Sequence, residues 1–315
     1  MEKSYKNNVI SLIDNDKYWG EFLESEMDNV LDIASNSDYS SVKEYIDEKL
    51  NRFDFIFGRE RSDFLFYLDL NNQSSVLDCG CGLGIHTFNA AARAGEVHSF
   101  DQSLKRCQFV SYRAQAEGIE NINIYHSDFE NLSFEDNQFD SILLNGVVEW
   151  LGEINDHKDP RDDQISVLKK LHGYLKPEGT VYIGIENRMS ASYLKGYDHN
   201  GLKFTSYFPR FLADWITKIR NKHPYRTYTY TYWGYKKLLK DAGFSRYDIY
   251  IALPGYNLPK YIVPFDNIPA IRFFVKTIAK DKGLKGKTMT FLVKFDFGVK
   301  ICRHLFFSYL IYAKK

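Results

Sequence analysis

The sequence predicts an α/β fold with a doubly wound, mostly parallel sheet. Its most informative segment is residues 76–84, where a short apolar run ends in Asp78 and the turn Gly-Cys-Gly-Leu-Gly follows. Such a run is typical of a buried parallel strand, and a helical pattern begins directly afterwards at residues 85–94. Glycines permit a sharp turn and let a ligand approach the backbone. Because open α/β sheets bind ligands at the carboxyl ends of their strands, this turn is the expected ligand site.

Four later segments continue the pattern in chain order. Two of them end at or next to an acidic residue, one contains the apolar run Ile-Leu-Leu, and the last begins with Leu-Lys-Pro-Glu-Gly. They are residues 97–101, 123–129, 139–145 and 175–185. Together with the glycine turn, they resemble the class I S-adenosylmethionine (SAM)-dependent methyltransferases. That resemblance implies a seven-stranded, Rossmann-like methyltransferase sheet and SAM as the cofactor.

The resemblance also implies roles for three acids. In that family the first acid precedes the glycine loop, the second holds the two ribose hydroxyls, and the third meets the adenine amino group. The matching residues here are Asp78, Asp101 and Asp128. A carboxylate suits the ribose because it can accept both hydroxyl protons. The whole expected cofactor site is Asp78, Gly80, Cys81, Gly82, Gly84, His86, Asp101, Gln102, Asp128, Phe129 and Asn145.

The glycine turn can also be interpreted in two further ways. Dinucleotide-binding loops usually read G-x-G-x-x-G, whereas the three glycines here are evenly spaced. Asp101 would suit the ribose of either cofactor, but Asp128-Phe129 and the Leu-Lys-Pro-Glu-Gly turn favour SAM. An α/β turn that binds no ligand is the second interpretation. For His86, at the start of the following helix, a packing role is the alternative to facing the bound ligand.

The rest of the chain is expected to complete this architecture. Helices that cap the sheet are expected at residues 19–33 and 41–55, a helix before the first strand at 64–68, and a helix closed by Gly243 at 233–243. Strands six and seven are expected at 247–252 and 308–313. The expected domains are a helical N-terminal cap at 1–60, a SAM-binding core at 61–188, and acceptor-site insertions with the C-terminal strands at 189–315.

Charge and cysteine content restrict the function classes. The formal net charge is zero, so no overall field favours nucleic acid as a partner. The chain has no apolar run of membrane-spanning length and its first residues do not form a signal peptide, so a cytoplasmic enzyme is expected. Its four cysteines lack the C-x-x-C spacing of metal sites, so neither a metal nor a disulfide is expected. The basic stretch 271–287 would suit an anionic lipid-linked acceptor or membrane surface; a solvated face is the alternative.

A narrower resemblance concerns the acceptor side. Glu-Asn-Arg at 186–188 and Asp-His-Asn-Gly at 198–201 resemble methyltransferases of bacterial surface-polysaccharide loci, some of them fused to glycosyltransferases. That family commonly has Thr where this chain has Asn200. The resemblance implies O-methylation of a sugar or glycan intermediate, although most acceptors of that family are unassigned.

The catalytic candidates follow from the chemistry of methyl transfer. An acceptor hydroxyl needs a base, and His199 is the leading candidate because an unshifted imidazole titrates near neutrality. Glu149 and Glu186 follow strands four and five, where either would orient an acceptor hydroxyl. Arg188 would suit an anionic group on the acceptor. If residues 228–232 are extended, the rings of Tyr228, Tyr230 and Tyr232 lie on one face, where they would bind a sugar.

Each of these candidates has an alternative. His199 is equally consistent with a structural loop histidine, Arg188 with an ion pair, and the three tyrosines with core packing. For the whole protein, the alternatives are N-methylation of a small amine or amino sugar, and a non-catalytic SAM-binding partner of a glycosyltransferase. N-methylation would need no strong base.

Overall fold

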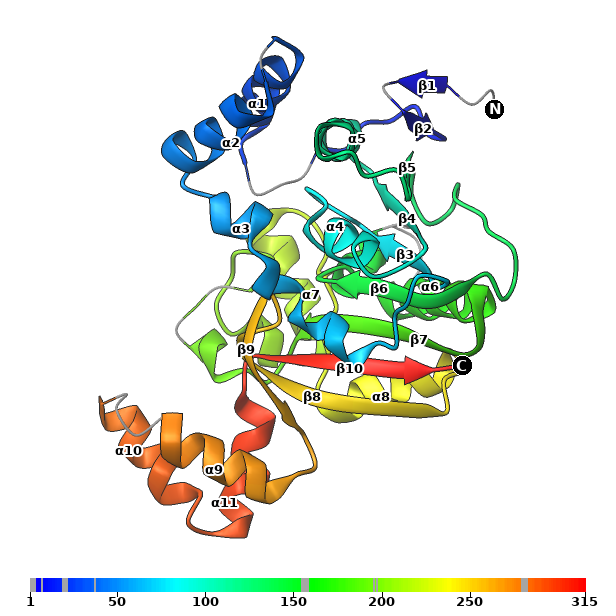
Figure 1. Cartoon of the computed structure of the whole chain (residues 1–315). Helices are drawn as coiled ribbons and strands as arrows, with labels where there is room; N and C mark the ends of the chain where they lie inside the picture. Colours follow the sequence, from blue (N-terminus) through cyan, green and yellow to red (C-terminus); the bar gives the residue numbers. More distant parts are fainter. Residues whose placement is uncertain are drawn as a thin grey trace. The chain divides into compact units, whose positions relative to one another are not determined.

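The computed structural model of the chain describes residues 4–6, 8–18, 22–36, 38–153, 159–194, 196, 198–278 and 283–315. These residues form two compact units. Unit 1 comprises Met1–Leu144 and Gly173–Thr180, and unit 2 comprises Asn145–His172 and Val181–Lys315. The helices and strands of both are labelled in Figure 1.

Unit 1 contains a mostly parallel sheet in the order β1-β2-β5-β4-β3-β6. The strands are β1 Ser4–Lys6, β2 Val9–Ser11, β3 Ser75–Cys79, β4 Glu96–Asp101, β5 Ile122–His126 and β6 Phe139–Asn145. β3 pairs in parallel with β4 and β6, β5 pairs in parallel with β4 and β2, and only the β1–β2 pair is antiparallel among these. β3, β4 and β6 are buried almost throughout, as expected for parallel strands covered on both faces.

Helices surround this sheet. α4 Ile85–Ala91 follows β3, and α5 Leu104–Glu117 follows β4. The side chain of Ser103 caps the first turn of α5, and Gly118 ends the helix in the left-handed conformation. The elements before β3 are α1 Glu24–Asn36, α2 Tyr39–Glu44, the π-helical turn η1 Tyr45–Lys49, α3 Phe53–Phe57 and the 3-10 helix η2 Arg59–Tyr67. Met27 of α1 and Ile46 of η1 share an apolar core with Phe109 of α5, so these N-terminal elements pack against α5.

In unit 2 the strand order is β7-β10-β8-β9 (Figure 1). The strands are β7 Leu175–Glu186, whose first residues belong to unit 1, β8 Arg246–Gly255, β9 Leu258–Pro264 and β10 Ser308–Lys314. The long helices are α6 Pro160–Tyr174, α7 Arg210–Asn221 and α8 Tyr232–Asp241, and α9 Ile268–Ile278, α10 Gly283–Leu292 and α11 Asp296–Cys302 follow β9. Short 3-10 helices are η3 Val148–Glu153, η4 Ala191–Leu194, η5 Thr205–Tyr207 and η6 Arg303–Leu305. β8 pairs antiparallel with both β10 and β9.

The predicted fold class is confirmed: this is an α/β fold with a mostly parallel sheet and N-terminal helices. The seven expected strands correspond to β3, β4, β5, β6, β7, β8 and β10. The structure adds β1, β2 and β9, which are short or polar in sequence. Trp19, Lys280 and Lys282 lie outside the described residues, and the three expected domain ranges stay a prediction. No helix in the described part of the chain is long and apolar enough to cross a membrane.

Candidate functional site

Backbone hydrogen bonds fix the glycine turn after β3. The amides of Gly80 and Cys81 both donate to the carbonyl oxygen of Phe100 in β4, at 2.9 and 3.0 Å. Gly80, Gly82 and Gly84 have φ angles of 69°, 56° and 83°. Other residues adopt this left-handed region only at a cost. The even spacing of the glycines therefore corresponds to three left-handed positions within one turn.

Gly82 and Gly84 each have a further reason to be glycine, and the two reasons differ. A Cβ at Gly84 would lie 2.8 Å from the ring of Phe88 and 3.0 Å from Val110, so this glycine permits the close packing of α4. A Cβ at Gly82 would meet only Nη1 of Arg106, at 3.9 Å, among the described residues. The space beside Gly82 is therefore open, as expected for a backbone that a ligand approaches.

Asp78 lies one residue before the end of β3 and is buried. Its carboxylate accepts a hydrogen bond of 2.7 Å from the hydroxyl of Thr87 in α4. Burial raises the pKa of Asp78 to about 7, against the lowering effect of this hydrogen bond. Burying a carboxylate costs free energy, and strongly shifted carboxyl groups are frequent at functional sites.

Asp101 ties the end of β4 to the glycine turn. Its Oδ2 atom accepts a hydrogen bond from the amide of Gly82 at 2.9 Å, and its Oδ1 accepts one from the amide of Ser103 at 2.9 Å. The guanidinium of Arg106 lies 3.4 Å from Oδ2, and both side chains are buried. Since a carboxylate offers about four acceptor positions, these contacts leave room for a further donor. The ribose-holding role of Asp101 stays a prediction.

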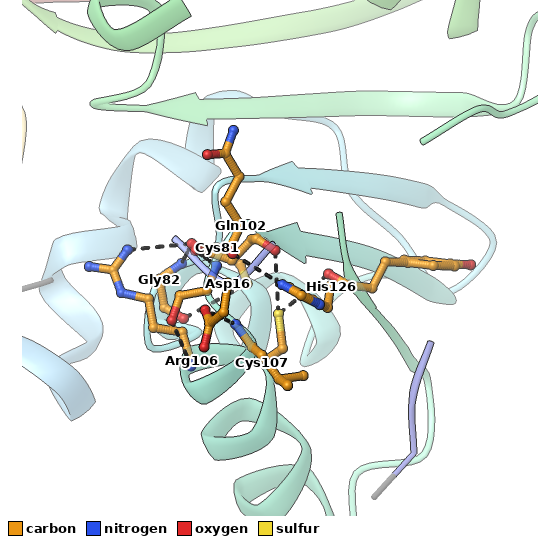
Figure 2. Close-up of polar contacts among 11 residues, drawn as sticks. Asp16, Cys81, Gly82, Gln102, Arg106, Cys107 and His126 are labelled. Atoms are coloured by element: carbon orange, nitrogen blue, oxygen red, sulfur yellow. Dashed lines mark hydrogen bonds and ion pairs between the residues drawn. The ribbon is translucent and has the colours of Figure 1, made fainter. Parts of the chain in front are cut away.

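The loop after β4 is held from two other segments (Figure 2). His126 at the end of β5 donates through Nε2 to the carbonyl oxygen of Gln102 at 3.1 Å, and Asp16 accepts from the amide of Leu104 at 3.0 Å. The side chain of Gln102 points away from these contacts (Figure 2). Sequence reasoning missed Asp16, Arg106 and His126, because no motif marks a residue that supports a loop from another segment.

Two further predicted cofactor residues have clear local roles. The carboxylate of Asp128 accepts hydrogen bonds from the amides of Glu130 and Asn131, at 3.0 and 2.8 Å, and so fixes the turn after β5. Phe129 packs edge-to-face on Phe100, with ring centroids 4.9 Å apart. Their contacts with a cofactor stay predictions.

His86 is buried in α4. Its Nδ1 atom lies 2.9 Å from the hydroxyl of Ser62, and its ring packs edge-to-face on Phe64. Burial, together with the charge of Arg61, lowers the pKa of His86 to about 3, so the imidazole is neutral. These contacts agree with a packing role, and a cofactor contact of His86 stays a prediction.

In unit 2, three of the predicted catalytic side chains lie together. One carboxylate oxygen each of Glu149 and Glu186 and one ring nitrogen of His199 all lie within 4.8 Å of one another. Nε2 of His199 donates to Oε2 of Glu186 at 3.3 Å. Glu149 and Glu186 are buried, and the ring of His199 packs edge-to-face on Trp150 with centroids 5.2 Å apart. We call Glu149, Glu186 and His199 the carboxylate–histidine cluster.

The cluster shifts the pKa values of its own members. Burial lowers the pKa of His199, but the hydrogen bond to Glu186 and the charges of Glu186 and Glu149 raise it more. The net result is a pKa of about 9. Burial and the charge of Glu186 raise the pKa of Glu149 to about 8. The adjacent carboxylates thus favour the imidazolium form of His199, and its role as the general base stays a prediction.

A pocket of about 290 Å³ opens beside this cluster in unit 2. Its lining residues come from the end of β7, the segment after it and the residue that precedes β10: Glu186, Ser192, Tyr193, Gly196, Asp198, His199 and Phe307. Except for Glu186, all of these residues lie in the range 189–315 that was expected to form the acceptor side.

Residues 70–226 match a family described as a methyltransferase domain. This stretch contains the glycine turn, Asp101, Asp128 and the whole carboxylate–histidine cluster. The chain carries a class I SAM-dependent methyltransferase domain. SAM is the methyl donor of this domain.

Named relatives match parts of the chain. A demethylmenaquinone methyltransferase of Staphylococcus epidermidis is 28% identical over 156 residues, which are 47% of this chain and 60% of that protein. A ubiquinone biosynthesis O-methyltransferase of Acinetobacter baumannii is 29% identical over 120 residues, 38% of this chain and 46% of that protein. A solved structure of a SAM-dependent methyltransferase from Aquifex aeolicus has a TM-score of 0.45 at 13% identity, covering 84% of this chain and 92% of its own. The chain thus spans 60% or less of the length of these two curated relatives.

Two further predicted site residues lie in unit 2, Arg188 on the acceptor side and Asn145 from the expected cofactor site. The guanidinium of Arg188 donates to the backbone carbonyl oxygens of Ser206 and Phe208, and Asn145 accepts a hydrogen bond of 3.0 Å from the hydroxyl of Tyr182. A contact of Arg188 with the acceptor and one of Asn145 with the cofactor stay predictions.

The three tyrosines do not form the expected platform. Tyr232 is the first residue of α8, so the segment is not extended through it, and all three rings are buried. Arg210 lies over the ring of Tyr228 at 4.0 Å, and the hydroxyl of Tyr230 donates to Gln164 at 2.6 Å. The three rings pack inward and are not among the residues that line the pocket with Glu186 and His199, and their contact with an acceptor stays a prediction.

Proposed function

We propose that this protein is an active SAM-dependent methyltransferase that methylates a hydroxyl group of a small acceptor, most simply a sugar or glycan intermediate. The observation that carries the proposal is the buried carboxylate–histidine cluster, two members of which line a pocket in unit 2. Buried acids and an imidazole that converge on a pocket are frequent at active sites.

Chain connectivity links Glu149 to the sheet that carries the glycine turn. Glu149 follows the last residue of β6 by four positions, and β6 pairs with β3, whose carboxyl end carries the glycine turn. Ligands of open α/β sheets bind outside the carboxyl ends of the strands. Methyl transfer gains most from alignment of the two reactants, which lowers the barrier by about 7–11 kcal/mol.

The chemistry of the pocket supports a polyhydroxy acceptor. Its lining combines the carboxylates of Glu186 and Asp198 and the hydroxyl of Ser192 with the rings of Tyr193 and Phe307. Carboxylates and hydroxyls hydrogen-bond sugar hydroxyls, while the apolar faces of a sugar ring pack on aromatic rings. The polysaccharide-locus resemblance at residues 186–188 and 198–201 points to the same acceptor class.

A phenolic acceptor is the second candidate. The curated relatives are named for the methylation of demethylmenaquinone and for ubiquinone biosynthesis. A quinol also carries a hydroxyl that a cluster of this kind would bind. N-methylation of a small amine or amino sugar is a third candidate, and a SAM-binding protein that serves a glycosyltransferase without catalysis is the fourth.

The test is a methyl-transfer assay with labelled SAM against nucleotide sugars, glycan fragments, amino sugars and soluble quinols. We expect label on a sugar oxygen; label on an oxygen or a ring carbon of the quinol, or on an amine nitrogen, would overturn the sugar assignment. S-adenosylhomocysteine binding without turnover on every acceptor class would overturn catalysis and favour a non-catalytic SAM-binding role.

Variants connect the activity to the cluster. His199→Ala should lower turnover by about 10²-fold or more, while S-adenosylhomocysteine affinity stays within a factor of about three, because only acceptor-side chemistry is lost. His223→Ala, which removes an exposed histidine, is the matched control and should retain activity. Equal turnover of the two variants would remove His199 from the mechanism.

A further inference from the structure

The carboxylate–histidine cluster has the composition of a metal site. It offers two carboxylate oxygens and one imidazole nitrogen within 4.8 Å of one another, from segments that are far apart in sequence. Ligands at about 2.0–2.2 Å from a metal ion lie roughly 3–4 Å from each other, so only a small contraction separates this arrangement from a coordinating one.

Glu149 gives an independent indication that this cluster takes a ligand. Its side chain is fully buried, and among the described residues neither carboxylate oxygen makes a hydrogen bond of standard geometry; the neighbouring carboxylate of Glu186 is a second acid and raises the pKa of Glu149. Buried polar groups without partners are rare and costly, and buried charges are normally paired or bound to a metal. An atom that accepts electron pairs from both Glu149 and Glu186 would satisfy these oxygens.

The surrounding residues hold the three side chains in place. The backbone oxygen of Glu186 accepts a hydrogen bond of 2.8 Å from the hydroxyl of Tyr235, and the amide of Gly146 donates to the carbonyl oxygen of Gly184 at 2.8 Å. The second bond joins the segment before Glu149 to β7. Supporting contacts of this kind orient the ligands of metal sites.

The turn that carries His199 is fixed as well. The carboxylate of Asp198 accepts hydrogen bonds from the amides of Asn200 and Leu202, at 2.9 and 3.2 Å. With its own carboxylate used in this turn, Asp198 positions His199 without joining the cluster.

We propose that Glu149, Glu186 and His199 bind one divalent transition-metal ion. Three ligands leave coordination positions free, and Glu186 and His199 line the pocket, so those positions are accessible from it. Two carboxylates with one imidazole suit Mn²⁺, Fe²⁺ or Zn²⁺ better than Mg²⁺ or Ca²⁺, which prefer oxygen ligands alone.

This inference rests on the proposed function and makes it more specific. A bound cation polarises an oxygen that coordinates it and makes a hydroxyl easier to deprotonate. The acceptor would then be an oxygen nucleophile, and O-methylation would be favoured over N-methylation.

The test uses full-length protein stripped with EDTA and titrated with MnCl₂, followed by the electron paramagnetic resonance signal of free Mn²⁺ and by calorimetry with ZnCl₂. We expect one ion per chain. Glu149→Gln and His199→Ala should each weaken binding by about 10-fold or more, because each removes one of three ligands. Glu153→Gln, which neutralises an exposed acid of the same 3-10 helix η3, should bind like the wild type.

Two results would overturn the metal site: no binding of either ion at millimolar concentration, or equal binding by the wild type, Glu149→Gln and His199→Ala. Thermal unfolding of each variant, measured in parallel, establishes that it is folded. S-adenosylhomocysteine titrations on the same samples separate the two proposals, since loss of the metal site leaves cofactor binding intact, whereas loss of cofactor binding rejects the proposed function.

Discussion

The carboxylate of Asp78 in β3 accepts a 2.7 Å hydrogen bond from the hydroxyl of Thr87 in α4. This bond joins the two elements that flank the glycine turn, at a buried position. Burial nevertheless raises the pKa of Asp78 to about 7. A carboxyl group at such a position lowers the free energy of unfolding at neutral pH. A destabilising group of this kind is expected where it binds a ligand.

Asp78→Asn should therefore stabilise the protein at high pH. The folded-state pKa lies above the unfolded value of 3.8, so the folded state binds the proton more tightly, and the contribution of Asp78 to stability is lost as the pH rises from about 4 to about 7. The asparagine keeps an acceptor for Thr87 without the charge. We expect a gain in the free energy of unfolding on the order of a few kcal/mol at pH 8 and a smaller gain at pH 5. Denaturant unfolding at both pH values measures this, and an equal gain at both would contradict the raised pKa.

Gly82→Ala and Gly84→Ala should separate ligand binding from packing. Both positions have a positive φ, so each variant loses about 1–2 kcal/mol from backbone strain. Only at Gly84 would the new Cβ meet a ring, at 2.8 Å, which costs roughly a further 1–3 kcal/mol. Gly82→Ala should instead lower S-adenosylhomocysteine affinity by at least about 10-fold, because its Cβ fills open space beside the turn. Calorimetric titration and thermal unfolding give the two readouts, and a Gly82→Ala variant with unchanged affinity would place the ligand elsewhere.

Asp101→Asn should weaken S-adenosylhomocysteine binding. The amide retains one oxygen acceptor for the Gly82 backbone, but it loses the charge and one ribose acceptor. A buried hydroxyl left without its partner costs about 1–3 kcal/mol, which corresponds to roughly 5- to 150-fold in affinity. Glu130→Gln, at an exposed acid after β5, is the control and should bind normally. If Asp101→Asn folds and titrates like the wild type, the assignment of the ribose partner is wrong.

The elements that the sequence predicts best are those with strong apolar runs. β3, β4 and β6 combine such runs with buried faces, and the glycine turn is marked by three residues that the backbone geometry requires. β1 and β2 have only three residues each and contain polar side chains, so the pairing of β2 with β5 and of β1 with β2, rather than composition, forms them. Tertiary pairing of this kind leaves no local pattern to read.

The candidate acceptor site was predictable in its members but not in its chemistry. Glu149 and Glu186 were expected at strand ends and His199 in the acceptor-side insertion, yet only the folded chain brings their ligand atoms within 4.8 Å. The cysteine spacing that argued against a metal does not apply to ligands from three separate segments. The three tyrosines do not form the expected platform, because alternation predicts a shared face only in a strand. Thr231 instead caps α8, in which Tyr232 is the first residue.

The helices after β9 should bind anionic membranes, as a lipid-linked acceptor would require. Phe273 of α9 and Phe297 of α11 are 72% and 74% exposed, and exposed lysines lie on or next to the same helices: Lys276, Lys287, Lys294 and Lys300. Residues 270–315 contain 11 basic and 2 acidic residues in total. Each cation near an anionic surface contributes about 1 kcal/mol, and exposed aromatic rings add apolar contact. We expect co-sedimentation with phosphatidylglycerol-containing vesicles, weaker at high salt, and none with phosphatidylcholine alone.

The double variant Phe273→Ser/Phe297→Ser should reduce this vesicle binding by at least about 5-fold, because it removes the apolar contacts and leaves the charge unchanged. Phe66→Ser is the matched control, since Phe66 is 70% exposed but lies in unit 1, and it should bind vesicles like the wild type. Both proteins should retain S-adenosylhomocysteine affinity, because none of the three rings belongs to the glycine turn or its supports. Equal loss in the double variant and in Phe66→Ser would mean that vesicle binding depends on general surface hydrophobicity. Binding to phosphatidylcholine as strong as to anionic vesicles would show that the lysines of α9–α11 do not direct it.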